Sequence, residues 1–306
     1  MATVAERAGG HVLGGLVIVD KAPGMTSHDV VGRARRILGT RRVGHAGTLD
    51  PMATGVLVLG VGRTTKLLGH LSLATKEYHA TIRLGQATTT DDAEGEVVSA
   101  SPAGHITEDD YAPVIRSLTG VIDQVPSSVS AIKIDGKRAY QRVRSGEDVA
   151  LPSREVAITR FDAVEARPAG DLLDIDVEVE CSSGTYIRAL ARDLGSALGV
   201  GGHLVRLRRT RVGPFSLDDA RTLEQLAENP TMSLTLDEAV SRAFPVRLIS
   251  DAEAQELRNG KWLEPTGEFA GVHGAVDGEG TAWALLAEKG RRASPVFVAR
   301  PVGVVD

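Results

Sequence analysis

The chain has 306 residues, of which 42% are hydrophobic and 25% are charged. These proportions are those of an ordinary globular protein of about two domains, and they exclude collagen-like, coiled-coil and disordered chains. The single cysteine, Cys181, excludes an intramolecular disulfide and a cysteine-rich zinc site. No apolar run approaches the roughly 18 residues of a membrane span, and the N-terminal segment lacks a signal-peptide core, so we expect a cytoplasmic protein.

The net charge of −5 conceals an uneven distribution of charged residues. Residues 1–216 hold 26 basic and 25 acidic side chains, whereas residues 217–306 hold 9 basic and 15 acidic ones. The first part also contains three basic clusters, at residues 33–42, 133–144 and 206–211. A single cluster is most often a solvated face, but three of them in a near-neutral region favour a polyanionic partner.

In the first half of the chain, strands and helices are predicted from apolar runs and from capping residues. Strands are expected at residues 16–20, 56–61 and 78–84. Helices are expected at residues 27–38, 65–73 and 107–118. Ser27 is the expected N-cap of the first helix, and Thr107 with Asp110 resembles a capping box.

In the second half, the clearest strand alternates apolar residues with acids. Strands are predicted at residues 156–164, 172–180 and 204–208. Helical segments are expected at residues 137–144, 185–198 and, in pieces, 223–239. After Pro245 the segments are short and glycine-rich, which indicates a small β-rich domain with its boundary near Phe244.

Signatures of a cofactor site are missing from the sequence. Residues 60–66 (GVGRTTK) follow a strand and precede a helix, as a phosphate loop would. They lack the third glycine of a dinucleotide fingerprint and the Gly-Lys-Ser/Thr ending of a P-loop. The eight histidines show no metal-ligand spacing, so we expect neither a cofactor nor a metal.

Residues 44–55 (GHAGTLDPMATG) form the segment richest in chemistry-bearing residues. They place a histidine and an aspartate on a glycine-rich loop before a buried strand, and such loops frequently carry function. By spacing alone, the favoured interpretation is that Asp50 with Pro51 starts a turn and that His45 is an ordinary surface residue.

This loop resembles the catalytic loop of the TruB family of tRNA pseudouridine synthases, and further segments resemble the family's other motifs. They occur in family order within residues 13–215, at 20–27, 76–78, 84–91, 126–140, 183–188 and 202–209. The resemblance implies an α+β (mixed α/β) fold with a central, mostly antiparallel sheet. It further implies a catalytic domain over 1–244, a thumb-like RNA-binding insertion at about 124–154, and a small β-rich, PUA-like domain over 245–306.

The family resemblance also implies a reaction, in which the T-loop uridine of tRNA is isomerised to pseudouridine without a cofactor. Asp50 corresponds to the nucleophile, and Arg188 to the guanidinium beside it, which would favour the ionised carboxylate. Tyr78 corresponds to the tyrosine that stacks on the target base. Since that base lies inside a folded RNA arm, it must be flipped out.

RNA-binding roles follow from the same resemblance. His45 corresponds to the residue that fills the space of the flipped base, and Leu207 to an apolar residue near the pocket. Lys21 is expected to support the loop or to contact the RNA backbone. The basic residues expected to contact the T arm are Arg33, Arg36, Arg41, Arg42, Lys133, Lys137, Arg138, Arg142 and Arg208.

Two alternatives stay open at this point. One is a non-catalytic RNA-folding or RNA-binding module, and the other is a guide-RNA-dependent relative of the family. The presence of Asp50, Tyr78 and Arg188 together argues against the first, and the thumb-like insertion argues against the second. We expect a monomer that needs no protein partner and no membrane.

Overall fold

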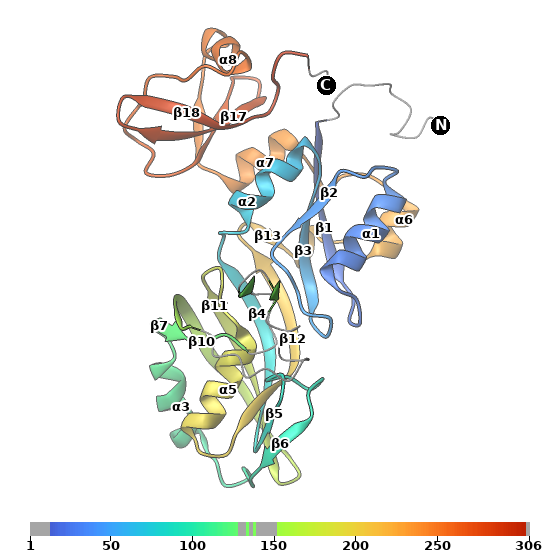
Figure 1. The fold of residues 1–306 in the computed structure, drawn as a ribbon, viewed down its shortest axis with the longest axis vertical. Helices are drawn as coiled ribbons and strands as arrows, with labels where there is room; N and C mark the ends of the chain where they lie inside the picture. Colours follow the sequence, from blue (N-terminus) through green and yellow to red (C-terminus); the bar gives the residue numbers. More distant parts are fainter. Residues whose placement is uncertain (1–12, 128–132, 135–136, 139–151, 304–306) are drawn as a thin grey trace. The chain divides into compact units, whose positions relative to one another are not determined.

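The computed structural model describes residues 13–127, 133–134, 137–138 and 152–303. The chain divides into two compact units, one formed by residues 1–73 with 211–306 and the other by residues 74–210. One boundary between them falls inside strand β12 (Gly202–Val212; Figure 1).

The first unit is built around an antiparallel pair of long strands. β1 (Gly14–Lys21) pairs with β3 (Thr54–Gly62) over its whole length, so that Lys21 is opposite Gly55. Short strands extend this pair: β2 (Val43–Ala46) on β3, and β14 (Leu234–Thr235) on β1. The remaining elements of this part are α1 (Ser27–Ile37), η1 (Arg63–Leu67), α2 (Leu68–Leu71), β13 (Phe215–Ser216), η2 (Leu217–Asp219), α6 (Leu223–Glu228) and α7 (Leu236–Ala243).

A four-stranded sheet follows in the same unit. Its order is β15-β16-β17-β18, with β15 parallel to β16 and the other neighbours antiparallel. Its elements are β15 (Val246–Leu248), α8 (Asp251–Arg258), β16 (His273–Val276), β17 (Ala282–Lys289) and β18 (Arg292–Val298). The prediction of a small β-rich domain near the C-terminus is confirmed, whereas its exact boundary stays a prediction.

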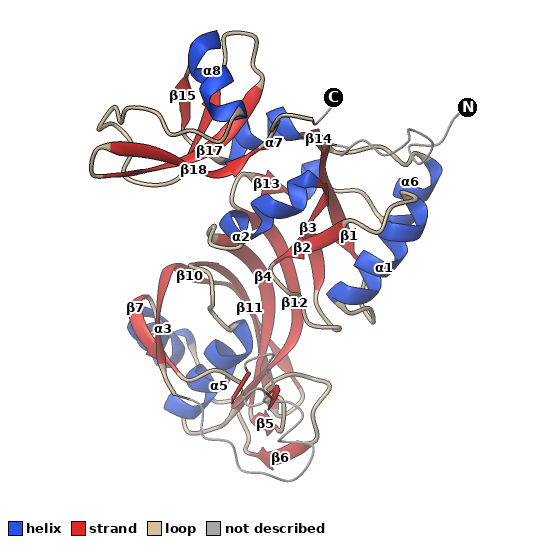
Figure 2. Cartoon of the chain, turned by 45° about the horizontal axis from the view of Figure 1, so that its top comes forward, coloured by secondary structure: helices blue, strands red, loops and turns tan. Residues whose placement is uncertain are grey.

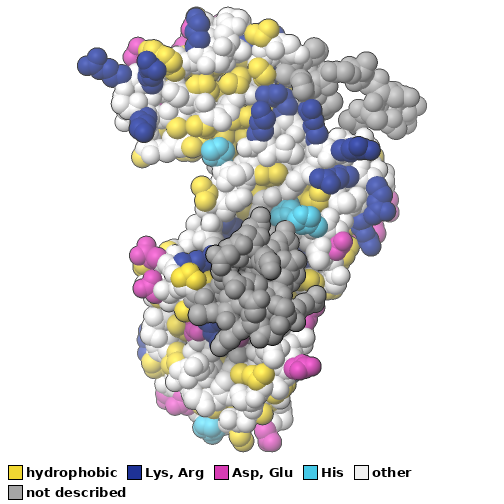
Figure 3. Space-filling view, viewed as in Figure 1, with side chains coloured by type: hydrophobic (Ala, Val, Ile, Leu, Met, Phe, Trp, Pro, Cys, Tyr) yellow, Lys and Arg dark blue, Asp and Glu magenta, His cyan; other side chains and the backbone are white. Residues whose placement is uncertain are grey.

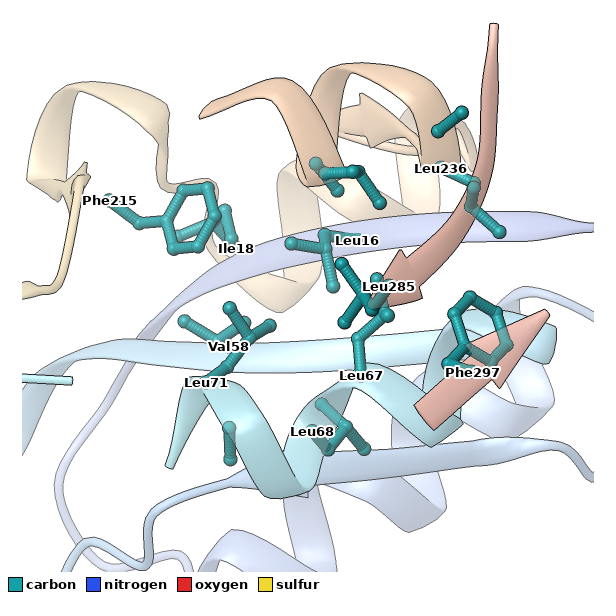
Figure 4. Packing of buried hydrophobic residues seen from close by; sticks show 14 of the residues in the cluster. Leu16, Ile18, Val58, Leu67, Leu68, Leu71, Phe215, Leu236, Leu285 and Phe297 are labelled. Atoms are coloured by element: carbon teal, nitrogen blue, oxygen red, sulfur yellow. The ribbon is translucent and has the colours of Figure 1, made fainter. Parts of the chain in front are cut away.

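One hydrophobic core joins this C-terminal sheet to the N-terminal strands (Figure 4). Leu16 of β1 and Leu67 of η1 are fully buried in the same cluster as Leu285 of β17 and Phe297 of β18. Arg63 adds polar contacts, donating to the backbone carbonyls of residues 298 and 299 at 2.7 and 2.9 Å. The C-terminal sheet therefore takes part in the core of the first unit.

The second unit contains a larger sheet in the order β12-β4-β11-β10-β7. The pairs of β11 with β4 and β10, and of β10 with β7, are antiparallel. Helices α3 and α5 lie side by side on one face of this sheet (Figure 2). The elements are β4 (Lys76–Leu84), β5 (Gln86–Thr88), β6 (Val97–Ala100), α3 (Glu108–Ser117), β7 (Gly120–Gln124), β8 (Lys133–Ile134), β9 (Lys137–Arg138), β10 (Arg154–Ala169), β11 (Leu172–Cys181) and α5 (Ile187–Ala197).

The predicted fold class, α+β with a mostly antiparallel sheet, is confirmed, but two local predictions are wrong. The N-cap of α1 is Thr26, which forms a capping box with Asp29, because the Ser27 side chain is buried and bonded elsewhere. Residues 137–138 form strand β9 and not the start of a helix, because they pair with residues 133–134. The rest of that predicted helix, residues 139–144, lies outside the described residues. Among the described residues, no helix is long and apolar enough to cross a membrane.

The shared core predicts a stability effect in the C-terminal sheet. Leu285→Ala should lower the free energy of unfolding by about 2–5 kcal/mol, since it opens a cavity in a fully buried cluster. Leu248→Ala is the matched control, because Leu248 lies in the same sheet but is 74% exposed, and it should change stability by less than about 0.5 kcal/mol. Equal effects in urea unfolding would contradict the shared core.

Candidate active site

Asp50 lies half-buried on the loop between β2 and β3, and a buried lysine holds the backbone beside it. Lys21, at the end of β1, has no exposed surface. Its Nζ donates to the carbonyls of Ala22, Met25 and Pro51 at 3.0, 2.8 and 3.1 Å. The ammonium therefore ties the residue after Asp50 to the turn that precedes α1, which is a loop-supporting arrangement.

A second set of bonds holds the residue before Asp50. The buried Ser27 hydroxyl accepts the N–H of Leu49 at 2.9 Å and lies 3.2 Å from its carbonyl, to which it donates. The N–H of Gly24 donates to the carbonyl of Pro51 at 2.8 Å. The backbone is thus fixed on both sides of Asp50, and the residue itself is half-buried.

His45 lies on β2, half-buried and opposite Leu59 of β3. Its ring makes an edge contact with the ring of His28 on α1, with centroids 5.6 Å apart at 75°. The same unit therefore carries both the candidate nucleophile loop and the flat side chain predicted to fill the space of a flipped base.

Arg188 belongs to the second unit, where it is 5% exposed in the first turn of α5. Its Nη1 lies 3.2 Å from Asp92 Oδ2 and donates to the carbonyl of Thr90 at 3.0 Å. Asp92 is itself 3% exposed, so the two charges form a buried ion pair. Removing one partner of such a pair leaves an uncompensated buried charge, which is strongly destabilising.

Asp92 sits in a tightly bonded turn that sequence reasoning missed. The Thr88 hydroxyl donates to its carbonyl at 2.7 Å, and the N–H of Glu94 donates to its Oδ1 at 3.1 Å. The preceding residue, Asp91, has a positive φ of 59° and lies 3.3 Å from Arg192 of α5. Burial raises the pKa of the Asp91 carboxyl above its usual value. The sequence feature that could have indicated Asp92 is its position, as an acid directly after the motif at 84–91.

The other candidate residues of the second unit lie on its sheet. Tyr78 on β4 is 7% exposed and opposite Val179 of β11, and Leu207 on β12 is 6% exposed. Lys76, two residues before Tyr78, is also buried and donates to the carbonyl of residue 74 at 2.7 Å. Burial, and then the charge of Arg209, lowers the pKa of Lys76 to about 8.

Arginines gather on the α1 side of the first unit (Figure 3). Four of the predicted RNA-contacting residues are exposed there: Arg33, Arg36, Arg41 and Arg42. In the second unit Arg208 is half-buried on β12. Lys133, Lys137 and Arg138 lie on β8 and β9, and Arg142 lies outside the described residues.

The C-terminal sheet carries a small basic group of its own despite its acidic composition. Lys289, Arg291 and Arg292 are exposed at the turn between β17 and β18. The Arg292 guanidinium lies 4.9 Å from the ring centroid of Trp262, which is 41% exposed. Over the described part of the chain, no three His, Cys, Asp or Glu residues are grouped so that they could hold a metal ion.

Solved structures with a similar fold come from two complexes. A chain of a Cbf5–Nop10–Gar1 complex matches with a TM-score of 0.74 at 25% identity, covering 98% of this chain and 92% of its own length. A chain of an H/ACA ribonucleoprotein bound to a substrate RNA matches with a TM-score of 0.71 at 25% identity, covering 95% and 86%. The chain therefore shares its fold with chains of these two complexes.

Sequence comparison identifies both the class, the pseudouridine synthases, and the family within it. The model of the TruB family pseudouridylate synthase N-terminal domain matches residues 35–187, and two C-terminal models, for tRNA pseudouridylate synthase B and tRNA pseudouridine synthase II, match residues 188–244 and 244–300. A tRNA pseudouridine synthase B of Nocardia farcinica is 64% identical over 294 residues, which is 96% of each chain. Its counterpart in Rhodococcus jostii is 61% identical over 302 residues, or 98% of this chain and 99% of the relative. The chain therefore belongs to the TruB family, and it is an isomerase that forms pseudouridine in tRNA.

The buried position of Lys21 predicts how its loss would affect the enzyme. Lys21→Met should lower turnover by about 100-fold, because the Asp50 loop loses its anchor and misplacement by about 1 Å has an effect of that size. Affinity for tRNA, measured by filter binding, should stay within about threefold of the wild type. Lys66→Met, at an exposed lysine of η1, is the control and should change neither quantity. Loss of affinity with unchanged turnover would instead indicate an RNA contact by Lys21.

Proposed function

We propose that this enzyme isomerises the T-loop uridine of tRNA, with Asp50 as the nucleophile and without a cofactor. The observation that carries the proposal is the anchored loop of Asp50, a half-buried residue whose neighbours in the chain are held by Lys21 and Ser27. A nucleophile held on a rigid backbone meets the geometric need of covalent catalysis. The cytoplasm is the expected compartment, and a monomer without a protein partner is the expected form.

The reaction requires no net change of atoms or electrons. The N1–C1′ bond of uridine breaks, the uracil rotates, and C5 bonds to C1′. C5 then loses its hydrogen as a proton, and N1 gains a proton. Three routes are chemically open to Asp50: attack at C1′, attack at C6, and assistance to elimination at the sugar. Each route needs an ionised and oriented carboxylate.

Tyr78 and Arg188 are proposed to complete the site around the flipped uracil. An aromatic face suits stacking on the base, and a phenol can accept the proton that leaves C5. A guanidinium remains charged and pairs with a carboxylate in a defined plane, so Arg188 would favour the ionised form of Asp50. The ion pair with Asp92 and the bond to Thr90 support this role, because they hold the guanidinium in one orientation.

The T arm is the proposed binding partner, and its phosphates are the proposed targets of the exposed arginines on the α1 side of the first unit. His45 is proposed to occupy the space that the flipped base leaves. Only 11 residues of the chain are Phe, Trp or Tyr, so a long single-stranded stacking platform is not favoured. Recognition of a folded RNA by shape and phosphate contacts fits this composition better.

A guide-RNA-dependent activity is the second candidate, because the structural matches include H/ACA ribonucleoprotein chains at 25% identity. The relatives at 61–64% identity are called tRNA pseudouridine synthase B, which favours direct action on tRNA. Turnover of a bare tRNA transcript by the purified chain separates the two activities. Turnover that depends on an added guide RNA would favour the second.

The role of Asp50 is tested by its removal. Asp50→Ala should reduce tritium release from C5-labelled uridine in tRNA by roughly 10⁴-fold or more, the order of effect seen when an essential catalytic group is lost. Binding of tRNA should persist, because the loop anchors remain. Asp109→Asn, at an exposed acid in the first turn of α3, is the control and should leave the rate unchanged. Full activity of Asp50→Ala would end the assignment.

The exposed arginines predict a salt effect. Arg41→Gln together with Arg42→Gln should weaken tRNA binding and reduce the slope of log affinity against log salt by about 1 for each lost phosphate contact. The rate constant at saturating tRNA should change little, since neither residue belongs to the proposed reacting groups. Affinity measured from low to moderate salt checks this, and an unchanged slope would show that these arginines do not contact phosphates.

A further inference from the structure

Two residues opposite each other at one end of a strand pair both contact the turn before α5. Gln124 ends β7, Arg154 begins β10, and the two are partners in the antiparallel register. Gln124 is 1% exposed, and its amide makes two hydrogen bonds to the backbone of Tyr186. Its Nε2 donates to the Tyr186 carbonyl at 3.1 Å, and its Oε1 accepts the Tyr186 N–H at 2.8 Å.

Tyr186 is the N-cap residue of α5, and its own side chain makes no capping hydrogen bond. The Gln124 amide thus bonds both the N–H and the carbonyl of the residue at which the helix begins, as a paired residue of a neighbouring strand would. Arg154, on the other strand of the pair, contacts the same turn. Its guanidinium lies 4.6 Å from the ring centroid of Tyr186 and donates a hydrogen bond to the carbonyl of Gly184. The helix start is therefore set from outside by β7 and β10.

The residues after Gln124 continue the same network. The carbonyl of Val125 accepts from Arg192 of α5 at 2.7 Å. The Ser127 hydroxyl donates at 3.1 Å to the carbonyl of Thr90, and this same carbonyl accepts from Arg188 at 3.0 Å. The segment 124–127 is thus bonded both to α5 and to the acceptor of Arg188.

We propose that Gln124 is a positioning residue for Arg188. Arg188 is only two residues beyond Tyr186, in the first turn of α5, so the two bonds to Tyr186 set where its guanidinium meets Asp92 and Thr90. The inference rests on the proposed role of Arg188 in the reaction. It adds a residue that acts through the start of one helix.

The chemistry of the amide explains why glutamine suits this position. A primary amide offers a donor and an acceptor, and both are used by one backbone unit. A carboxylate can accept the Tyr186 N–H but cannot donate to its carbonyl, and an alanine does neither. In the sequence, Gln124 and Arg154 flank residues 125–153, which make up most of the predicted RNA-binding insertion. Both flanking residues contact Tyr186, the N-cap residue of α5.

The test compares Gln124→Ala with Asp123→Asn, a control at an exposed residue of the same strand. With tRNA bound at saturating enzyme, the single-turnover rate constant of Gln124→Ala should fall by about 10- to 100-fold, the size expected for a displaced reacting group. The tRNA dissociation constant should stay within about threefold, and the control should match the wild type. A loss of folding alone would lower the concentration of active enzyme and leave the rate constant at saturation unchanged.

A double variant separates action through Arg188 from action elsewhere. Arg188→Lys should be slow, and adding Gln124→Ala should slow it no further, because residues that act through one group are not additive. Gln124→Glu, which keeps the volume, should be slow near neutral pH and should recover as the introduced carboxyl protonates and regains a donor. Gln124→Glu tests the inference even if Gln124→Ala does not fold.

Three results would overturn the inference. One is a rate constant for both Gln124 variants within about twofold of the wild type while Arg188→Lys is slow. Another is a double variant that is slower than Arg188→Lys by the full factor of Gln124→Ala. A normal rate for Arg188→Lys would instead remove the proposed role of Arg188, and the inference with it, so this failure is distinguishable from the other two.

Discussion

A buried ammonium group that holds backbone carbonyls is the interaction on which the candidate site depends. Lys21 reaches its position because β1 pairs with β3 to its last residue, which brings the lysine beneath the loop that carries Asp50. Burying an ammonium is unfavourable unless oxygen atoms replace its water, and three carbonyls do so here. Their convergence draws two separate segments together. The carboxylate of Asp50 therefore projects from a backbone that has little freedom to move.

The second unit repeats this principle with an arginine. Arg188 is buried against a carboxylate and a carbonyl, both from the turn around Asp92, and the start of its helix is held by Gln124. In both units a buried cation is oriented by acceptors from elsewhere in the chain. If Asp50 and Arg188 take the roles proposed for them, both groups are oriented before the substrate binds, and such preorganisation raises the catalytic rate.

The acidic surplus near the C-terminus has a structural explanation. Glu238 and Glu253 complete capping boxes at the starts of α7 and α8. Asp237 pairs with Arg300, and Asp219 pairs with Arg242. The carboxylate of Glu288 accepts backbone N–H groups of residues 266 and 267. Many of the acids that make the whole chain negative are thus bonded within the fold, and the net charge says little about what the exposed arginines contact.

The sequence by itself determined the elements that depend on local patterns, and the family through its motifs. The apolar runs of β1, β3 and β11 and the capping box at Thr107 depend on neighbours within a few residues, so they were readable. The order of the motifs indicated the family and, through it, Asp50, Tyr78 and Arg188 as candidates. Tertiary structure decided which groups hold them. Ser27 bonds a residue 22 positions away, Gln124 one 62 away, and Arg188 one 98 away. Such partners leave no periodic or local signal, because the chain brings them together only when the sheets form. For that reason the sequence pattern predicts Ser27 as a helix cap and gives no indication of Gln124.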